Sequence, residues 1–119
     1  MHIGNARGGA IGDCLASVLD WAGYSVNREF YVNDAGNQIE KFATSLEVRY
    51  LQHFDCSVEL PEDAYHGQDI VDHAENFIAE YGDKYVNAQS SERRKALVDY
   101  ALPKNIAGLE KDLGRYRIT

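Results

Sequence analysis

Residues 2–22 read HIGNARGGAIGDCLASVLDWA and contain the first element of the chain. From residue 11 onward the apolar positions recur every three or four residues, which predicts one face of a helix over residues 5–22. Gly23 follows directly, as expected of a glycine that ends a helix. The apolar positions of this face are Ile11, Leu15, Val18, Leu19 and Ala22.

The beginning of that helix carries groups that suit a phosphate. Backbone N–H groups and the dipole at a helix N-terminus favour an anion, and the imidazole of His2 can donate a hydrogen bond to a phosphate oxygen. Glycines leave room for other groups to approach the first turns closely. Pattern alone does not separate this interpretation from an ordinary chain terminus. The glycines are Gly4, Gly8, Gly9 and Gly12.

After the first helix the pattern changes to a strand and then returns to helices. Residues 25–32 alternate apolar and polar side chains and are rich in β-branched and aromatic residues, which predicts a strand. Residues 33–36 predict a turn. Helical spacing resumes over residues 37–53 and 70–81, and residues 54–65 predict a loop between them.

The last third of the chain predicts an interrupted helix. Ser90 and Ser91 are candidates for the N-cap, and the apolar spacing runs to Gly114. A proline inside a helix removes a hydrogen bond and clashes with the preceding turn. We therefore expect either a kink or two shorter helices around Pro103.

Together these elements predict a helix-dominated α/β fold with four or five helices and one strand, at residues 25–32. A lone strand leaves its backbone N–H and C=O groups without partners. We therefore expect this strand to pair either with a second copy of the chain or with strands that lie outside this sequence.

Composition narrows the class of protein. The 119 residues, of which 45% are hydrophobic, suit one compact domain. The formal net charge of −7 argues against broad binding of nucleic-acid phosphates. Cys14 and Cys56 form no disulfide framework, so we expect reduced thiols in a cytoplasmic protein. No apolar run approaches the roughly 20 residues that span a bilayer, and no signal peptide begins the chain, so we expect no membrane.

Two blocks of sequence resemble the arginyl-tRNA synthetases, a family of class I aminoacyl-tRNA synthetases. His2-Ile3-Gly4-Asn5 resembles the His-x-Gly-His signature of class I, and residues 6–13 resemble the helix start of the arginyl enzymes. Residues 23–39 resemble the bacterial arginyl form throughout, in the expected order and at the expected distance. The remainder to Arg117 matches more loosely.

This resemblance implies part of a nucleotide-binding, Rossmann-like catalytic domain. Residues 1–53 would form its first part and residues 54–119 a helical insertion. The parent enzyme would be an arginine–tRNA ligase that joins arginine to its tRNA, with ATP supplied as its Mg²⁺ complex. Met1 lies directly before His2, so we expect the chain to be an internal piece of that enzyme.

The resemblance also implies site residues. His2 and Asn5 would stabilise the charge that develops on the ATP phosphates, and Gly4 would permit close approach of the adenosine. Asn5 departs from the pattern, because the family signature has a second histidine there; an amide can donate a hydrogen bond but cannot become cationic. Asp34 and Gln38 would lie near the substrate cleft, although Asp34 could instead cap the next helix.

The family also has an Asn-Pro strand before the signature and a lysine-rich second signature downstream, and neither is present here. We therefore expect the isolated chain to be inactive. The alternative from another class is a non-catalytic module that self-associates, as a homodimer, through its strand and apolar helix faces.

Two further clusters have ordinary explanations. His53, Cys56, His66 and His73 match no usual zinc spacing, so no metal site is predicted. The basic cluster at residues 93–95 opposes the dipole at the start of its helix. It predicts either a solvated face or, as the less favoured alternative, a contact with RNA phosphates.

Overall fold

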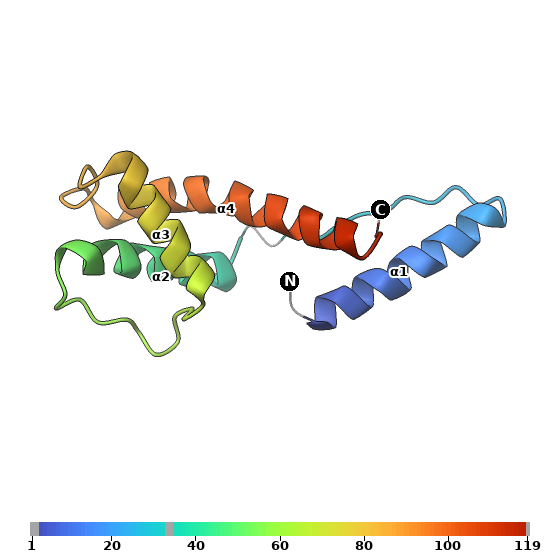
Figure 1. The fold of residues 1–119 in the computed structure, drawn as a ribbon, viewed down its shortest axis with the longest axis horizontal. Coiled ribbons are helices and arrows are strands. Elements are labelled where there is room, and N and C mark those ends of the chain that lie inside the picture. Colours follow the sequence, from blue (N-terminus) through green and yellow to red (C-terminus); the bar gives the residue numbers. More distant parts are fainter. Residues whose placement is uncertain (1–2, 33–34, 119) are drawn as a thin grey trace. The chain divides into compact units, whose positions relative to one another are not determined.

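The computed structural model describes residues 3–32 and 35–118. Those residues form helices α1 (Ile3–Trp21), α2 (Asn37–Phe54), α3 (Gln68–Tyr81) and α4 (Ser90–Arg115), as Figure 1 shows. They divide into two compact units. Unit 1 lies within residues 1–32 and 104–119, and unit 2 within residues 33–103, so the division of α4 falls just after Pro103.

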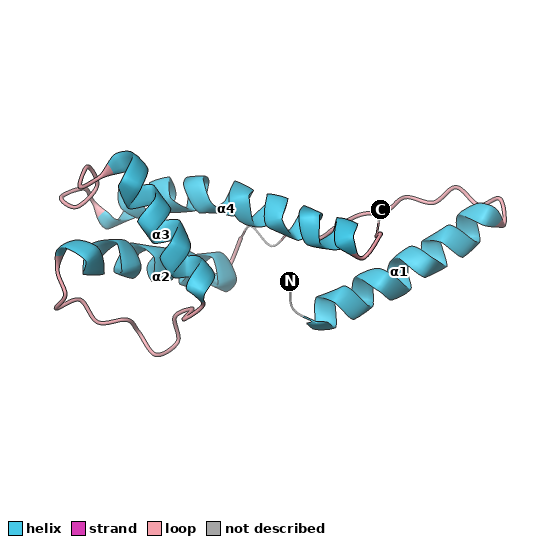
Figure 2. Cartoon of the chain, viewed as in Figure 1, coloured by secondary structure: helices cyan, strands magenta, loops and turns pink. Residues whose placement is uncertain are grey.

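The predicted α/β fold is wrong, because the described residues contain helices and loops and no strand (Figure 2). Residues 25–32 lack helical structure but form no ladder with another segment. A strand needs a neighbour to satisfy its backbone groups, and no described segment supplies one. The Rossmann-like sheet implied by the resemblance is therefore not formed by the described part of this chain.

The predicted helices are confirmed, and their ends show why they stop. Gly23 has φ 91°, and the N–H groups of Gly23 and Tyr24 donate to the carbonyls of Asp20 (3.0 Å) and Leu19 (3.1 Å). This pair of bonds satisfies the last carbonyls of α1 and requires the left-handed conformation that glycine adopts without strain. Gly82 ends α3 with φ 58°.

Helix α4 continues through Pro103 as a single helix of 26 residues, so the expectation of two shorter helices is wrong. Three of the side chains before the proline, Arg93, Leu97 and Ala101, are buried within unit 2. This packing stabilises the turns on the N-terminal side of the proline against the loss of one backbone hydrogen bond.

Unit 2 contains the hydrophobic core. Its centre is Tyr50, which is fully buried against Phe77 with ring centroids 5.6 Å apart in an edge-to-face arrangement. The Tyr50 hydroxyl donates to the Gly82 carbonyl (2.8 Å) and accepts from the Tyr85 N–H (3.2 Å), so the loop after α3 is tied to α2. The core cluster comprises Phe42, Leu46, Tyr50, Ile70, Phe77, Leu97 and Ala101.

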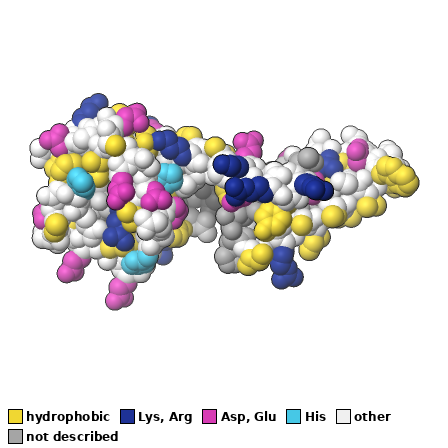
Figure 3. All heavy atoms as spheres, viewed as in Figure 1, with side chains coloured by type: hydrophobic (Ala, Val, Ile, Leu, Met, Phe, Trp, Pro, Cys, Tyr) yellow, Lys and Arg dark blue, Asp and Glu magenta, His cyan; other side chains and the backbone are white. Residues whose placement is uncertain are grey.

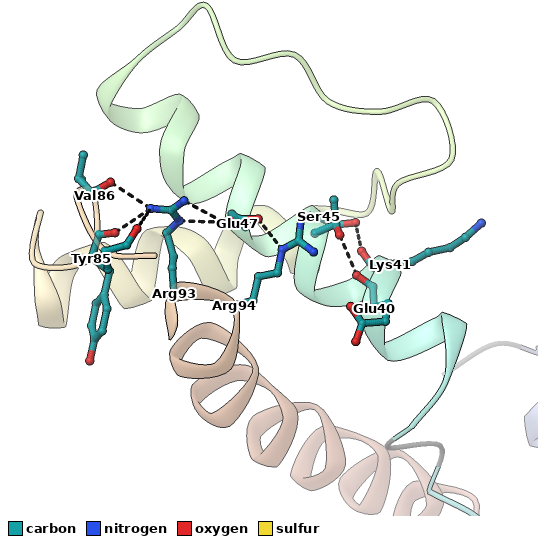
Figure 4. A network of polar contacts seen from close by, with 10 residues as sticks. Glu40, Lys41, Ser45, Glu47, Tyr85, Val86, Arg93 and Arg94 are labelled. Atoms are coloured by element: carbon teal, nitrogen blue, oxygen red, sulfur yellow. Dashed lines mark hydrogen bonds and ion pairs between the residues drawn. The ribbon is translucent and has the colours of Figure 1, made fainter. Parts of the chain in front are cut away.

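A buried ionic cluster joins α2 to the beginning of α4 (Figure 4). Glu47 accepts from Arg93 at 2.9–3.0 Å and from Arg94 at 2.5 Å. Arg93 also donates to the backbone carbonyls of Tyr85, Val86 and Ala88, each at 3.0 Å. The predicted solvated face at residues 93–95 is therefore wrong for Arg93, which is buried and holds the loop between α3 and α4.

The carboxylate of Glu47 stays ionised in this environment. Burial alone would raise its pKa, but hydrogen bonds from Arg94, Ser90 and Arg93 outweigh burial and leave the pKa below its ordinary value. Removing one partner of such a buried ion pair is strongly destabilising, because the other charge is then left buried without a partner.

Helix α1 in unit 1 has no comparable core. Only Ala6 and Ala16 are buried in it, whereas Ile11, Leu15 and Val18 are exposed. Trp21, at its last turn, is 94% exposed. The apolar face that predicts this helix therefore exists but is not covered by the described residues.

Two further expectations concern the whole chain. No helix in the described residues combines the length and the apolar character needed to cross a membrane. The predicted boundary between residues 53 and 54 concerns functional regions of a larger enzyme and stays a prediction. It differs from the division into compact units, because α2 and α3 pack against each other within unit 2.

Candidate functional site

The first turn of α1 carries two of the predicted signature residues. Gly4 and Asn5 lie in this turn and are exposed, and the turn contains no acidic side chain. The positive end of a helix dipole favours an anion or an electronegative group of a ligand. His2, the other predicted signature residue, lies outside the described residues.

Asn5 stands at the edge of a cleft within unit 1. The cleft has a volume of about 670 Å³, which is in the range of small-molecule pockets. One wall is α1, a second is the extended segment after it, and a third is the end of α4. The lining residues include Asn5, Gly8, Gly12, Asn27, Phe30 and Leu113.

The glycines of α1 that line this cleft differ in the space around them. A Cβ placed on Gly8 or Gly12 would have no other heavy atom within 4 Å, apart from the helix itself and chain neighbours, so the backbone faces open space there. A Cβ on Gly9 would lie 2.9 Å from the Ile118 Cδ1 atom and 3.6 Å from the Leu113 Cδ2 atom. Gly9 thus lets the end of α4 approach α1, and the other two leave room for a ligand.

Arg28 fixes the extended segment against α1. Its Nε atom donates to the Asp13 carboxylate at 3.3 Å, and a terminal nitrogen donates to the Ser17 hydroxyl at 3.2 Å. Sequence reasoning missed this contact, because it joins residues 11 to 15 positions apart and follows no helical period. The contacts of Arg28 therefore hold residues 25–32 in an extended form, and pairing within a sheet does not.

The electrostatics of the cleft favour some parts of a nucleotide over others. Its lining contains one cation, Arg28, and three carboxylates, Asp13, Glu29 and Glu110, for a net charge of −2. The glycine backbone and the amide of Asn27 suit an uncharged portion of a ligand. A triphosphate would be repelled unless Mg²⁺ or cations from elsewhere balanced its charge.

The predicted substrate-cleft residues are only partly described. Gln38 is exposed in the first turn of α2, within unit 2. Asp34 lies outside the described residues, and the N-cap position of α2 is held by Gly36, with φ 77° and no side-chain hydrogen bond. The roles of Asp34 and Gln38 in a substrate cleft stay predictions.

No metal centre is formed by the described part of the chain, where no three metal-ligating side chains converge. His53, Cys56 and His66 are exposed, and the His66 ring lies 3.4 Å from the Glu62 carbonyl.

Comparison with known proteins finds one family of enzymes. Residues 1–99 match the family described as tRNA synthetases class I (R), catalytic domain. An arginine–tRNA ligase of Caldanaerobacter subterraneus subsp. tengcongensis is 62% identical over 118 residues, which cover 99% of this chain and 21% of the relative. Arginine–tRNA ligases of Ruminiclostridium cellulolyticum and Acetivibrio thermocellus are each 60% identical over 120 residues, with the same coverage. The chain thus spans about one fifth of the length of these relatives. No solved structure matches it.

Proposed function

Because the chain belongs to the catalytic-domain family of the class I tRNA synthetases for arginine, we propose that the full-length protein carrying it is an arginine–tRNA ligase. Its substrates would be arginine, ATP as the Mg²⁺ complex, and tRNA. The observation that supports this most is the identity of 62% to a ligase over 99% of the chain. We expect the protein to act in the cytoplasm.

The proposed reaction has two steps. The arginine carboxylate attacks the α-phosphorus of ATP and releases pyrophosphate, and a ribose hydroxyl of the tRNA then attacks the arginyl carbonyl and releases AMP. In the first step negative charge shifts onto the departing phosphates. Groups aimed at that charge stabilise the transition state more than the ground state.

The signature residues of this chain would supply part of that stabilisation. His2 would donate a hydrogen bond to a phosphate oxygen, as would the amide of Asn5, which lines the cleft. Gly4 adds no side chain in the first turn of α1, so the adenosine could approach the backbone. Asn5 stays neutral at every pH, so its contribution would be smaller than that of an imidazolium.

The isolated chain is expected to lack the activity. The net charge of −2 in the cleft lining disfavours a triphosphate, and the lysine-rich signature that would grip the phosphates is not in this sequence. The alternative of a self-associating module loses one of its two grounds, because the described residues form no strand. The exposed apolar face of α1 remains, but the identity to arginine–tRNA ligases favours the enzyme.

The proposal is tested by charging assays on the full-length protein. We expect it to attach arginine, and not lysine, to a tRNA for arginine in the presence of ATP and Mg²⁺. A protein that charges no arginine under these conditions would rule the proposal out.

Asn5→Ala in the full-length protein tests the signature. Removing one hydrogen-bond donor from a transition state typically lowers kcat by about 100-fold. Asn76→Ala is a matched control, because Asn76 is an exposed asparagine of α3 whose side chain donates to the Asp72 carbonyl in the same helix. Equal activity of the two variants would remove Asn5 from the proposed site.

A further inference from the structure

The net charge of the chain is divided unevenly between its units. Within residues 33–103 there are 14 acidic and 6 basic residues, net −8, whereas unit 1 has 5 acidic and 6 basic residues, net +1. The overall −7 therefore belongs to unit 2. A polyanion is repelled by unit 2 and is not repelled by unit 1.

Three cations of unit 1 form one stripe on α4. Lys104, Lys111 and Arg115 are separated by seven and four residues, so at 100° per residue they fall within about 40° of one another around the helix axis. All three are exposed, and the Arg115 side chain is 71% exposed. With a rise of 1.5 Å per residue the stripe is about 16 Å long. Figure 3 shows Lys and Arg side chains gathered over the last turns of this helix.

The stripe points away from Leu113, which lines the cleft. Leu113 is about 180° from Lys104 around the axis, and Leu113 is the residue that approaches Gly9 of α1. Glu110 and Gly114 line the cleft together with Leu113. The stripe is therefore a separate surface of unit 1, and a ligand in the cleft would leave it accessible.

Three cations of unit 2 lie close to carboxylates of the same unit. Lys41, Lys95 and Arg94 lie 3.2, 2.5 and 2.5 Å from the carboxylates of Asp63, Asp99 and Glu47. In the stripe, the Arg115–Asp112 pair is longer, at 3.6 Å, and its Arg115 side chain is largely exposed. Such a pair contributes little and is readily exchanged for a stronger anion.

We propose that the stripe of Lys104, Lys111 and Arg115 contacts the phosphate backbone of the tRNA. This inference rests on the proposed function, which makes tRNA a substrate. The stripe positions the RNA and does not read its sequence, because cations that contact phosphates carry no base information. If the stripe were only a solvated face, it would add no affinity for RNA. A stripe that contacts phosphates instead gives binding that weakens as the salt concentration rises.

The expected salt dependence follows from the number of cations. Three phosphate contacts give a slope of log K against log salt of about −2 to −2.7. Affinity should therefore fall by about 15- to 40-fold between 50 and 200 mM salt. Removing one cation should make the slope less negative by about one.

The experiment measures binding of a fluorescently labelled tRNA transcript to the 119-residue chain by anisotropy, at several salt concentrations. We expect Lys111→Gln with Arg115→Gln to bind more weakly and with a slope near −1. The control is Lys41→Gln with Lys84→Gln, which changes net charge by the same amount in unit 2 and should keep the slope of the unmodified chain. Far-ultraviolet circular dichroism checks that α4 remains helical.

Either of two results would overturn the inference: an unmodified chain without salt-dependent binding, or a control that loses as much affinity as the α4 variant. The assay contains neither ATP nor arginine. Its failure would therefore leave the proposed ligase activity standing, and a protein that charges no arginine could still show the binding.

Discussion

Glu47 is the residue on which the acid stability of unit 2 depends most directly. Its folded-state pKa lies below the ordinary value of 4.5, so its ionised form stabilises the fold above about pH 4.5. That contribution is lost as the pH falls through the lowered folded-state value. In urea titrations, the free energy of unfolding should therefore decrease below pH 4.5, and Glu47→Gln should flatten this decrease.

Asp55 provides the internal reference for that measurement. Hydrogen bonds from the Ser57 side chain and backbone also lower its pKa, and it is present in both proteins, so the difference between their pH profiles isolates Glu47. Glu47→Ala should cost about 3–5 kcal/mol, because it leaves Arg93 buried without its carboxylate. Identical profiles for the unmodified chain and Glu47→Gln would contradict this account.

Arg93 shows what sequence reasoning could not see at the residue scale. Three consecutive basic residues read as a solvated face, and for the exposed Lys95, which pairs with Asp99, that interpretation is correct. The partner of Arg93 is 46 residues away, and its three carbonyl acceptors lie in an irregular loop. A contact of this kind has no period, so it becomes visible only when the helices are packed.

At the scale of elements, a glycine within α1 and the glycine that follows it should respond to substitution in opposite directions. Gly12→Ala should stabilise α1 by about 0.5–1 kcal/mol, since alanine favours a helix and a Cβ meets nothing there. Gly23→Ala should destabilise its end by about 1 kcal/mol, because Gly23 has φ 91°. The helical circular dichroism signal should rise in the first variant and fall in the second. A rise in both would mean that Gly23 does not determine where α1 ends.

Helices were predictable from this sequence and the strand was not, for one physical reason. A helix satisfies its hydrogen bonds within its own segment, so the apolar period at residues 37–53 or 70–81 suffices to identify it. A strand depends on a neighbour. Residues 25–32 have the composition of a strand, but within the described residues Arg28 fixes them to α1 and no second strand pairs with them.

At the scale of the whole molecule, the two units should differ in stability. Among the described residues, ten of the twelve buried hydrophobic side chains belong to unit 2, and the two in unit 1 are alanines. Local stability follows the density of buried apolar contacts. Hydrogen exchange of the chain should therefore be slow in α3 and in the core-facing turns of α2 and early α4, and faster by orders of magnitude in α1. Equal protection in α1 and α3 would contradict this division.

The family was predictable at this scale, while the site was predictable only in part. The blocks at residues 2–13 and 23–39 resemble arginyl-tRNA synthetases, and the match over residues 1–99 confirms that resemblance. The cleft beside Asn5 was not foreseen as a cavity, because its walls come from α1, the segment after it and the end of α4. The catalytic roles of His2 and Asn5 remain predictions.

The exposed position of Trp21 has a spectroscopic consequence. It is the only tryptophan in the chain, and it lies in unit 1, whereas Tyr50, Tyr81, Tyr85 and Tyr100 surround Phe77 in unit 2. Indole emission therefore reports on unit 1, and the near-ultraviolet dichroism of packed tyrosines reports on unit 2. Since the indole is already in water, its emission should stay almost constant while unit 2 unfolds and should shift towards the blue when another surface covers α1. One unlabelled sample can thus follow the folding of one unit and the docking of the other.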